Sequence, residues 1–301
     1  MRARRTVALL IAFAAIGSVF LRAGQQGSGQ TPSPFPLSYP IRERGTSITG
    51  AYEGWYADAD GSSRLLVGYF NRNTQQEFDI PPGPNNRIEP GGPDQGQPTH
   101  FLTSRQWGVF TIKVPKDLGD KKLTWTIVAN GFTNTVTMHT RKEWLVEPYL
   151  DAASKNTPPV LKFKADGPSF TGPPSTIAAS YLASVGQPLE LITWASDEGA
   201  KVNVELSAGR GRGGATGVFS PLVESWSKFR GAGDVTFSQA RPTLDRNNAG
   251  KGATTATFSA PGDYILRVQA NDSSGEGGGG FQCCWTNAHV AVSVKAASAS
   301  K

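Results

Sequence analysis

One stretch constrains the fold of this chain more than any other: residues 254–272, which read TTATFSAPGDYILRVQAND. Just inside it, Ala260-Pro261-Gly262-Asp263 has the residues of a type II turn, because proline presets φ at the second position and glycine accepts a positive φ at the third. After the turn apolar and polar residues alternate, which is typical of a strand with one buried face. We expect an inward set and an outward set, namely Tyr264, Leu266, Val268 and Ala270 against Ile265, Arg267, Gln269 and Asn271.

The N-terminus has the pattern of an export signal. A basic start is followed by an apolar run at residues 7–21 and then by small and polar residues. The run is shorter than the roughly 20 apolar residues that a membrane-spanning helix needs. We therefore expect residues 1–24 to be a signal peptide, and the alternative is a leader that stays uncleaved and holds the chain at a membrane. Residues 25–37, rich in Gly, Ser, Gln and Pro, predict a flexible tether.

Length and charge limit the classes of protein that fit. The 301 residues suffice for two ordinary domains, and 35 glycines with 21 prolines suit β-sandwiches with many turns. The formal net charge of +6 includes four leader arginines without any acid beside them, so the remaining chain carries +2. Nucleic acid is not expected as a partner, because so balanced a chain has no general attraction for polyanions.

Residues 38–149 predict a first β-sandwich domain. Asn130-Gly131 separates two runs of strand character, and this dipeptide is the strongest local hairpin signal, since both turn residues must adopt positive φ. The strands expected in this domain are Arg64–Phe70, Trp107–Val114, Leu123–Val128 and Phe132–His139.

A long irregular segment, residues 81–99, interrupts these strands with six prolines and four glycines. Such a composition cannot form a central strand, and a loop of this length inside a compact domain is often functional. We expect it to bring Asp94 and His100 near the end of the domain, as candidate ligand-binding residues. The alternative is a proline-stiffened surface loop that covers a sheet edge.

Residues 150–159 predict a short, semi-rigid linker. Residues 160–296 predict a second sandwich, followed by a tail at 297–301. Its expected strands are Leu189–Trp194, Lys201–Ser207, Val235–Ser238, Thr254–Phe258, Tyr264–Ala270 and His289–Lys295.

The second domain resembles Ig-like modules of the PKD (polycystic kidney disease) type. A Trp226-Ser227 strand, a Gly-x-Gly turn, a Val-Thr-Phe strand and a Phe-x-x-Pro-Gly-x-Tyr corner carry the resemblance over residues 226–272. The insertions at 207–217 and 275–285 depart from the family pattern. The resemblance implies an extracellular β-sandwich that serves as a spacer or binding module, with a tyrosine corner at Tyr264. The family supplies no catalytic residues, and the first domain resembles no family that we can name beyond the sandwich class.

Cys283 and Cys284 are the only cysteines, and they are adjacent. Neighbouring Cα atoms lie about 3.8 Å apart, short of the usual disulfide separation, so a bridge between them would be strained. We consider a vicinal disulfide, free or intermolecular thiols, and soft-metal binding with His289. Phe281 and Trp285 flank the pair, and their rings either form an apolar loop tip that contacts a ligand or fold back over the end of the sandwich.

No pattern in the sequence indicates catalysis. Gly-x-Ser-x-Gly, His-Glu-x-x-His and phosphate-loop motifs are all absent from the sequence. Among the three histidines, His139 and His289 fall on outward positions of expected strands, where a solvated side chain is the default. We therefore expect no catalytic residue, no metal and no cofactor.

The sequence thus predicts an exported, non-catalytic protein of two tandem antiparallel Ig-like sandwiches. It would act in the periplasm, outside the cell or at the cell surface as an adhesion, spacer or assembly module, with a protein or glycan of the envelope as partner. One alternative is a carbohydrate-binding module in which exposed Trp55 and Tyr56 stack on sugar rings. The other is a redox or metal role of the cysteine pair.

Overall fold

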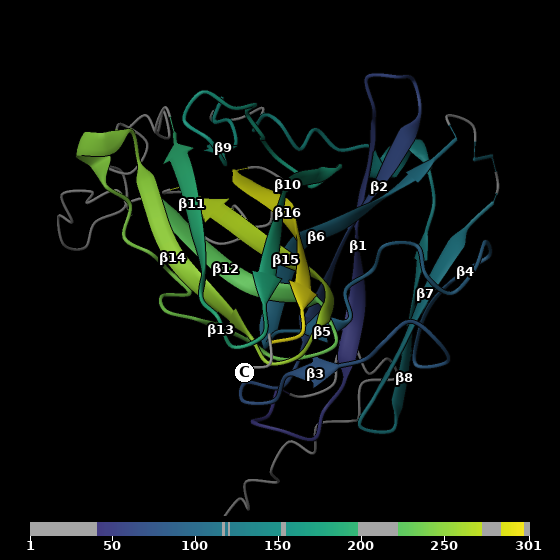
Figure 1. Cartoon of the computed structure of the whole chain (residues 1–301). Coiled ribbons are helices and arrows are strands. Elements are labelled where there is room, and N and C mark those ends of the chain that lie inside the picture. Colours follow the sequence, from purple (N-terminus) through teal and green to yellow (C-terminus); the bar gives the residue numbers. More distant parts are fainter. Residues whose placement is uncertain are drawn as a thin grey trace, which may run out of the picture. The chain divides into compact units, whose positions relative to one another are not determined.

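A computed structural model describes residues 41–115, 118–119, 121–151, 155–197, 222–272 and 284–297. Its regular structure is almost entirely β-strand (Figure 1), which confirms the all-β prediction. The expected signal peptide, the tether and the strand expected at Lys201–Ser207 lie outside these ranges. Within them, no helix has the length and apolar character needed to cross a membrane.

The N-terminal half contains two three-stranded sheets and a short strand pair. One sheet has the order β1 (Ile48–Ala57), β2 (Ser63–Asn71), β6 (Ser104–Val114), and the other has the order β4 (Asn86–Glu89), β7 (Leu123–Ala129), β8 (Phe132–Met138). The short pair is β3 (Phe78–Asp79) with β5 (His100–Phe101), and a single 3-10 turn, η1 (Lys142–Trp144), follows β8. The expected Asn130-Gly131 hairpin is confirmed, since β7 pairs antiparallel with β8 and the two turn residues have φ of 50° and 79°.

The C-terminal half is a sandwich of two four-stranded sheets. The first has the order β10 (Ile177–Ser184), β16 (Trp285–Lys295), β15 (Gly262–Asn271), β12 (Val223–Arg230). The second has the order β13 (Val235–Phe237), β14 (Lys251–Phe258), β11 (Leu189–Ser196), β9 (Val160–Lys162), and a 3-10 turn, η3 (Arg246–Asn248), precedes β14. One pair departs from the antiparallel expectation: β10 runs parallel to β16.

The turn before Tyr264 joins the two sheets of this sandwich. Strands β14 and β15 belong to opposite sheets, so the Pro261-Gly262 turn carries the chain across the core and does not close a hairpin. The Tyr264 hydroxyl donates to the carbonyl oxygen of Ala260 at 2.7 Å and accepts from the backbone N–H of Gly233 at 3.0 Å. The ring is buried and packs edge-on against Phe258. This is a tyrosine corner, as the sequence suggested.

The outward face of β15 is covered rather than solvated. Arg267, expected to face water, is only 4% exposed, because the N-terminal half packs against this face of the sheet. Phe229 and Ile265 accordingly join the hydrophobic core built around Trp125 in that half. Residues 39–301 form one compact unit, and the division into domains at residues 150–159 stays a prediction.

Among the strands that were not anticipated from the sequence, β1 and β10 are the longest. Strand β1 reads ITGAYEGWYA and β10 reads IAASYLAS, and neither shows clean alternation of apolar and polar residues. Strand β1 carries two glycines and a bulge between Tyr52 and Gly54, which shifts its register on β2. Small residues in β10 leave no periodic signal, because alanine and serine are tolerated on either face.

Replacing Tyr264 by Phe should destabilise the protein by about 1–3 kcal/mol, because the Ala260 carbonyl and the Gly233 N–H lose their buried partner. Urea unfolding of both proteins measures the difference. Tyr181→Phe is the matched control, since that half-buried tyrosine makes no hydroxyl hydrogen bond within the described residues, and its effect should stay within about 0.5 kcal/mol. Equal losses in the two variants would contradict a specific role for the corner.

Candidate functional site: the junction between the two halves

A bulge in β6 forms the centre of the junction. The pairing of β2 with β6 shifts between Val67 and Tyr69, so β6 carries extra residues at 107–109. Gly108 sits there with φ +51°, and a Cβ on it would lie 1.7 Å from the Trp285 ring. Only glycine therefore lets the bulge approach β16 this closely. Trp285 itself is fully buried and packs with Tyr56 and Leu66.

A buried carboxylate fixes the bulge from within the N-terminal half. Glu53, only 5% exposed, accepts from the Gly108 N–H at 2.9 Å and pairs with Arg105 at 2.7 Å. Burial raises the pKa of Glu53, while Arg105 and the Gly108 N–H oppose that rise. The Arg105 guanidinium also lies 3.9 Å from the centre of the Trp107 ring and donates to the carbonyl of Gln106. These contacts hold Arg105 in one orientation.

The C-terminal half meets the bulge with polar side chains from β15 and β16. Arg267 donates to Gln106 Oε1 at 2.8 Å and to the carbonyl of Trp107 at 3.1 Å. Asn287 donates to the carbonyls of Trp107 and Gly108 and accepts from Arg267 Nε at 2.8 Å. The carbonyls that the bulge removes from the β6 ladder are thus satisfied across the junction, as buried backbone groups must be.

His289 lies in the same contact and corrects the expectation of a solvated side chain. Its Nε2 is 3.0 Å from the carbonyl oxygen of Val109, and its ring lies 4.2 Å from that of Phe229. Burial at the junction, together with nearby Arg267 and Arg230, lowers the pKa of His289 to about 3. The imidazole is therefore neutral near pH 7 and donates to Val109. His139 is likewise not simply solvated, because it packs edge-on against Tyr52 and Trp144.

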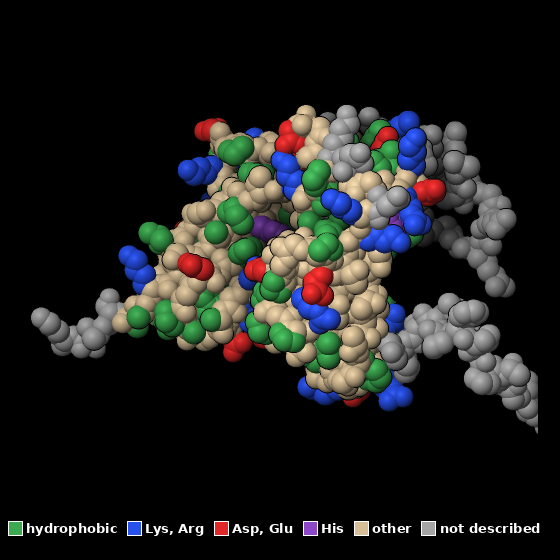
Figure 2. All heavy atoms as spheres, turned by 90° about the vertical axis from the view of Figure 1, so that its right-hand side faces the viewer, with side chains coloured by type: hydrophobic (Ala, Val, Ile, Leu, Met, Phe, Trp, Pro, Cys, Tyr) green, Lys and Arg blue, Asp and Glu red, His purple; other side chains and the backbone are tan. Residues whose placement is uncertain are grey.

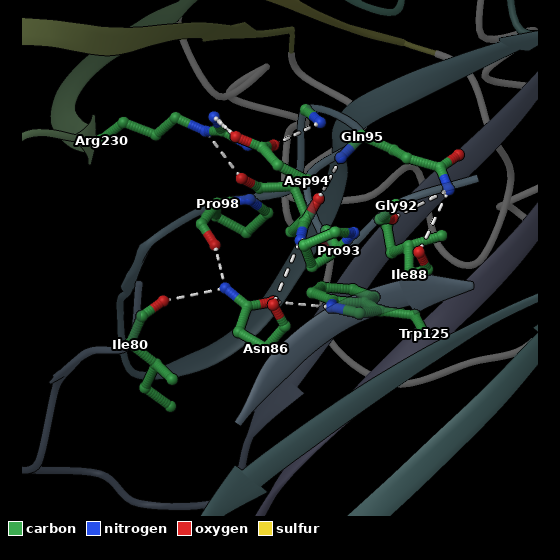
Figure 3. A network of polar contacts seen from close by, with 12 residues as sticks. Ile80, Asn86, Ile88, Gly92, Pro93, Asp94, Gln95, Pro98, Trp125 and Arg230 are labelled. Atoms are coloured by element: carbon green, nitrogen blue, oxygen red, sulfur yellow. Dashed lines mark hydrogen bonds and ion pairs between the residues drawn. The ribbon is translucent and has the colours of Figure 1, made fainter. Parts of the chain in front are cut away.

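The proline- and glycine-rich segment at residues 81–99 is held in one conformation by side-chain amides (Figure 3). Asn86 donates to the carbonyls of Ile80 and Pro98 and accepts from the Trp125 indole N–H at 2.9 Å. Gln95 donates to the carbonyls of Ile88 and Pro90. Because the segment has little regular structure, these bonds replace the ladder that a strand would supply.

This segment spans the junction through Asp94. Arg230 of β12 makes a two-point ion pair with the Asp94 carboxylate, at 2.7 and 3.1 Å, and donates to the carbonyl of Gln97 at 2.7 Å (Figure 3). The Arg230 guanidinium holds the pKa of Asp94 below its usual value. Just beyond, the Thr99 N–H donates to the carbonyl of Phe229, so the segment covers the free edge of β12.

His100, the other candidate on this segment, takes part in a separate set of ion pairs. Its ring nitrogens lie 3.0 Å from Asp79 and 3.2 Å from Glu77, and Asp79 also pairs with Lys228 of β12 at 2.8 Å. The structure therefore places Asp94 and His100 on the same side of the junction but in different contacts. Both sets tie the N-terminal half to β12.

A polar cleft opens beside the bulge. Its volume is about 290 Å³, and it lies between the start of β6 and the outward face of β12 and β15. Three arginines line it, Arg105, Arg241 and Arg267, together with hydroxyl and amide side chains. The sequence did not single out this cleft, because its walls come from stretches more than a hundred residues apart. On the face in Figure 2, by contrast, positive and negative side chains are interspersed.

The aromatic candidates lie largely in the interior. Tyr56 is 4% exposed and Trp285 is not exposed at all, which corrects the expectation that they contact a ligand, because a buried ring has no free face. Trp55 is half-buried, and its indole N–H donates to the carbonyl of Arg141 at 2.7 Å. Two exposed aromatic rings lie in this region: Trp144 stacks on Tyr52, and Tyr149 packs edge-on against Tyr56.

The cysteine pair lies at the limit of the described residues. Cys284 is buried, disulfide-bonded and has a φ of +118°. Cys283 and Phe281 lie outside the described residues, so the vicinal pairing stays a prediction. Among the residues that the structure describes, no three His, Cys, Asp or Glu side chains gather as they would around a metal ion.

Comparisons with known proteins give only distant likenesses. No protein-family model matches the sequence, and no curated protein matches it. Among solved structures, the S-layer protein rSbsC(31-844) is similar over 83% of this chain and 28% of its own length, at 11% identity and a TM-score of 0.23. The D0-D1 domain of intimin is similar over 82% of this chain and 97% of its own, at 13% identity and a TM-score of 0.24. The Yersinia pseudotuberculosis adhesin InvE is similar over 82% and 58%, at 11% identity and a TM-score of 0.24. Scores this low support no argument about function.

Gly108→Ala should destabilise the protein by more than the roughly 1–2 kcal/mol that a positive φ costs an alanine, because its Cβ also collides with Trp285. Denaturant unfolding measures the loss. Gly61→Ala is the matched control, since Gly61 has φ +81° and nothing within 4 Å of the added Cβ. The same loss in both variants would mean that the bulge tolerates the extra carbon.

Protonation of His289 should weaken the fold in acid. Its folded-state pKa is depressed from 6.5 to about 3, so between these values the unfolded chain binds the proton and the folded chain does not. The stability that the neutral imidazole contributes is fully present above pH 6.5. Below that pH the free energy of unfolding falls, with a slope that approaches about 1.4 kcal/mol per pH unit. His289→Gln retains an N–H donor without titrating. Urea unfolding from pH 7 to 4 should show a steeper decline in the wild type, and parallel declines would refute the assignment.

Proposed function

We propose that this chain is an exported, non-catalytic β-sandwich protein that serves as an assembly module at the cell surface or in the periplasm. The apolar leader at residues 1–24 supports the export. Residues 226–272 resemble PKD-type modules, a family of extracellular spacer and binding domains, and this resemblance supports the role as a surface module. We therefore assign the C-terminal sandwich to that type.

The assembly role is supported mainly by the unpaired edge of β10. This strand pairs with β16 on one side, and no described strand pairs with its other side. Its eight residues include neither charge nor proline, although these are the usual means by which sheet edges avoid pairing with other chains. Ile177 and Leu182 are 45% and 70% exposed on this strand. An open, uncharged edge with exposed apolar side chains is suited to strand addition.

The occupant that we propose for this edge is β10 of a second copy of the chain. Two identical strands pair antiparallel about a twofold axis, and an uncharged strand places no like charges opposite each other when it does so. Leu182 also borders a hollow of about 330 Å³ that is lined by Gln187, Pro188, Leu189 and Lys295. This hollow can receive side chains that flank a paired strand.

The absence of a catalytic role is part of the proposal and is supported by the state of the three histidines. His289 donates to a backbone carbonyl, His100 lies between two carboxylates, and His139 packs between aromatic rings. None of these contacts pairs a histidine with a serine or cysteine nucleophile, as the common hydrolytic sites require.

Sedimentation of the full mature chain over a range of concentrations tests the assembly role. We expect a concentration-dependent dimer, because a single strand pair buries less surface than a permanent interface does. Leu182→Lys should shift the chain to monomer by placing like charges along the paired edge.

Leu145→Lys is the matched control, because Leu145 is 54% exposed, lies outside β10 and bridges to Trp55 of β1, so this variant should dimerise like the wild type. A wild type that stays monomeric at every concentration would refute the proposal. So would a Leu182→Lys variant that dimerises as the wild type does.

A further inference from the structure

The arginines of the junction cleft are held in place before any ligand arrives. Arg267, only 4% exposed, is bonded to Asn287, Gln106 and the carbonyl of Trp107. Arg105 is bonded to Glu53 and to the carbonyls of Tyr69 and Gln106. Each guanidinium has five N–H donors in a rigid fork, and these bonds fix its plane. A fixed, partly desolvated guanidinium binds an oxyanion without a large loss of side-chain entropy.

The third arginine stands at the mouth of the cleft. Arg241 is exposed and follows a loop that is fastened to β12, since the backbone N–H of Trp226 donates to the carbonyl of Ala240 at 2.7 Å. The same loop is held to β14 through Thr254, whose hydroxyl donates to the carbonyl of Gln239 at 2.8 Å. Arg241 therefore projects from a fixed backbone position beside the other two.

The remaining walls supply neutral hydrogen-bonding groups. Ser225 pairs across the strands with Gln269, and Ser227 pairs with Arg267, so these four side chains share the outward face of the sheet. Both serines and Gln269 line the cleft. Ser104, on the opposite wall, has a φ of +65°, a conformation that is rare for a residue other than glycine and that tends to occur at functional sites.

The charged residues that line the cleft are all positive. Three arginines line the cleft, and no aspartate or glutamate does. Glu53 offsets the charge of Arg105 from outside the lining. A hollow of about 290 Å³ is close to the lower end of the range for small-molecule sites. Its positive wall and low-dielectric surroundings favour a small anion over a neutral molecule of the same size.

We propose that this cleft binds a small ligand through an oxyanion group, either a carboxylate or a phosphate or sulfate. Arg105 and Arg267 form the fixed floor of the site, and Arg241 closes on the anion from the solvent side. Ser225, Ser227 and Gln269 bond to the hydroxyls of a ligand that carries them, such as a sugar acid. The walls come from both halves of the chain, so the ligand also bridges the junction. This site is independent of the β10 edge.

Isothermal titration calorimetry of the full mature chain tests the site with four probes: inorganic phosphate, sulfate, glucuronate and glucose. At least one of the anions should bind, more weakly as ionic strength rises, while neutral glucose should not. Stronger binding of glucuronate than of phosphate or sulfate would identify a sugar acid as the source of the anion, and the reverse order a phosphate or sulfate ester.

Arg241→Gln should weaken anion binding by about tenfold, the effect of losing one charge-assisted contact. Arg246→Gln is the matched control, because Arg246 is exposed in η3 and does not line the cleft, and it should bind as the wild type does. Gln269→Glu provides a second variant, since an acid on the cleft wall should abolish binding of every anion.

Three results would overturn the proposal. The first is a wild type to which none of the three anions binds. The second is an equal loss of binding in Arg246→Gln and Arg241→Gln, which would indicate unspecific attraction. The third is glucose binding as tightly as glucuronate, which would show that hydroxyl groups alone are recognised.

Discussion

The contact of the β6 bulge with the outward face of β15 and β16 is the interaction on which the rest of this structure depends. The bulge turns the carbonyls of Trp107 and Gly108 out of the β6 ladder. Asn287 and Arg267 donate hydrogen bonds to these carbonyls in place of the lost ladder bonds. A charged residue as buried as Arg267 is costly unless each donor is paired. The junction therefore has one geometry in which its polar groups are satisfied, and this fixes how the two halves pack.

That fixed packing explains the position of the cleft. Arg105 and Arg267 come from different halves, and both are oriented by the same bonds that hold the bulge. The long segment at residues 81–99 adds a second contact between the halves, the ion pair of Asp94 with Arg230. A binding site between the two halves needs such contacts, because a mobile junction would lose the alignment of the arginines. The proposed anion site is in this sense a consequence of the way the halves are joined.

Assembly through β10 and binding in the cleft use separate parts of the C-terminal sandwich. Strand β10 lies at one edge of its sheet, and β12, which lines the cleft, lies at the other. The edge of β12 is covered by the segment that precedes β5, whereas no described strand covers β10. An assembled form could thus bind ligand in every copy, since pairing at β10 leaves the cleft free.

The sequence by itself determined the strands whose signals are local. The alternation after Tyr264, the Pro261-Gly262 turn and the Asn130-Gly131 hairpin each follow from the φ preferences and side-chain period of neighbouring residues. Only the tertiary structure decided that the outward face of β15 is buried, that His289 is neutral, and that Arg105 and Arg267 share a cleft. Those outcomes depend on residues about 160 positions apart, and a strand's pattern shows which residues share a face but not what covers it.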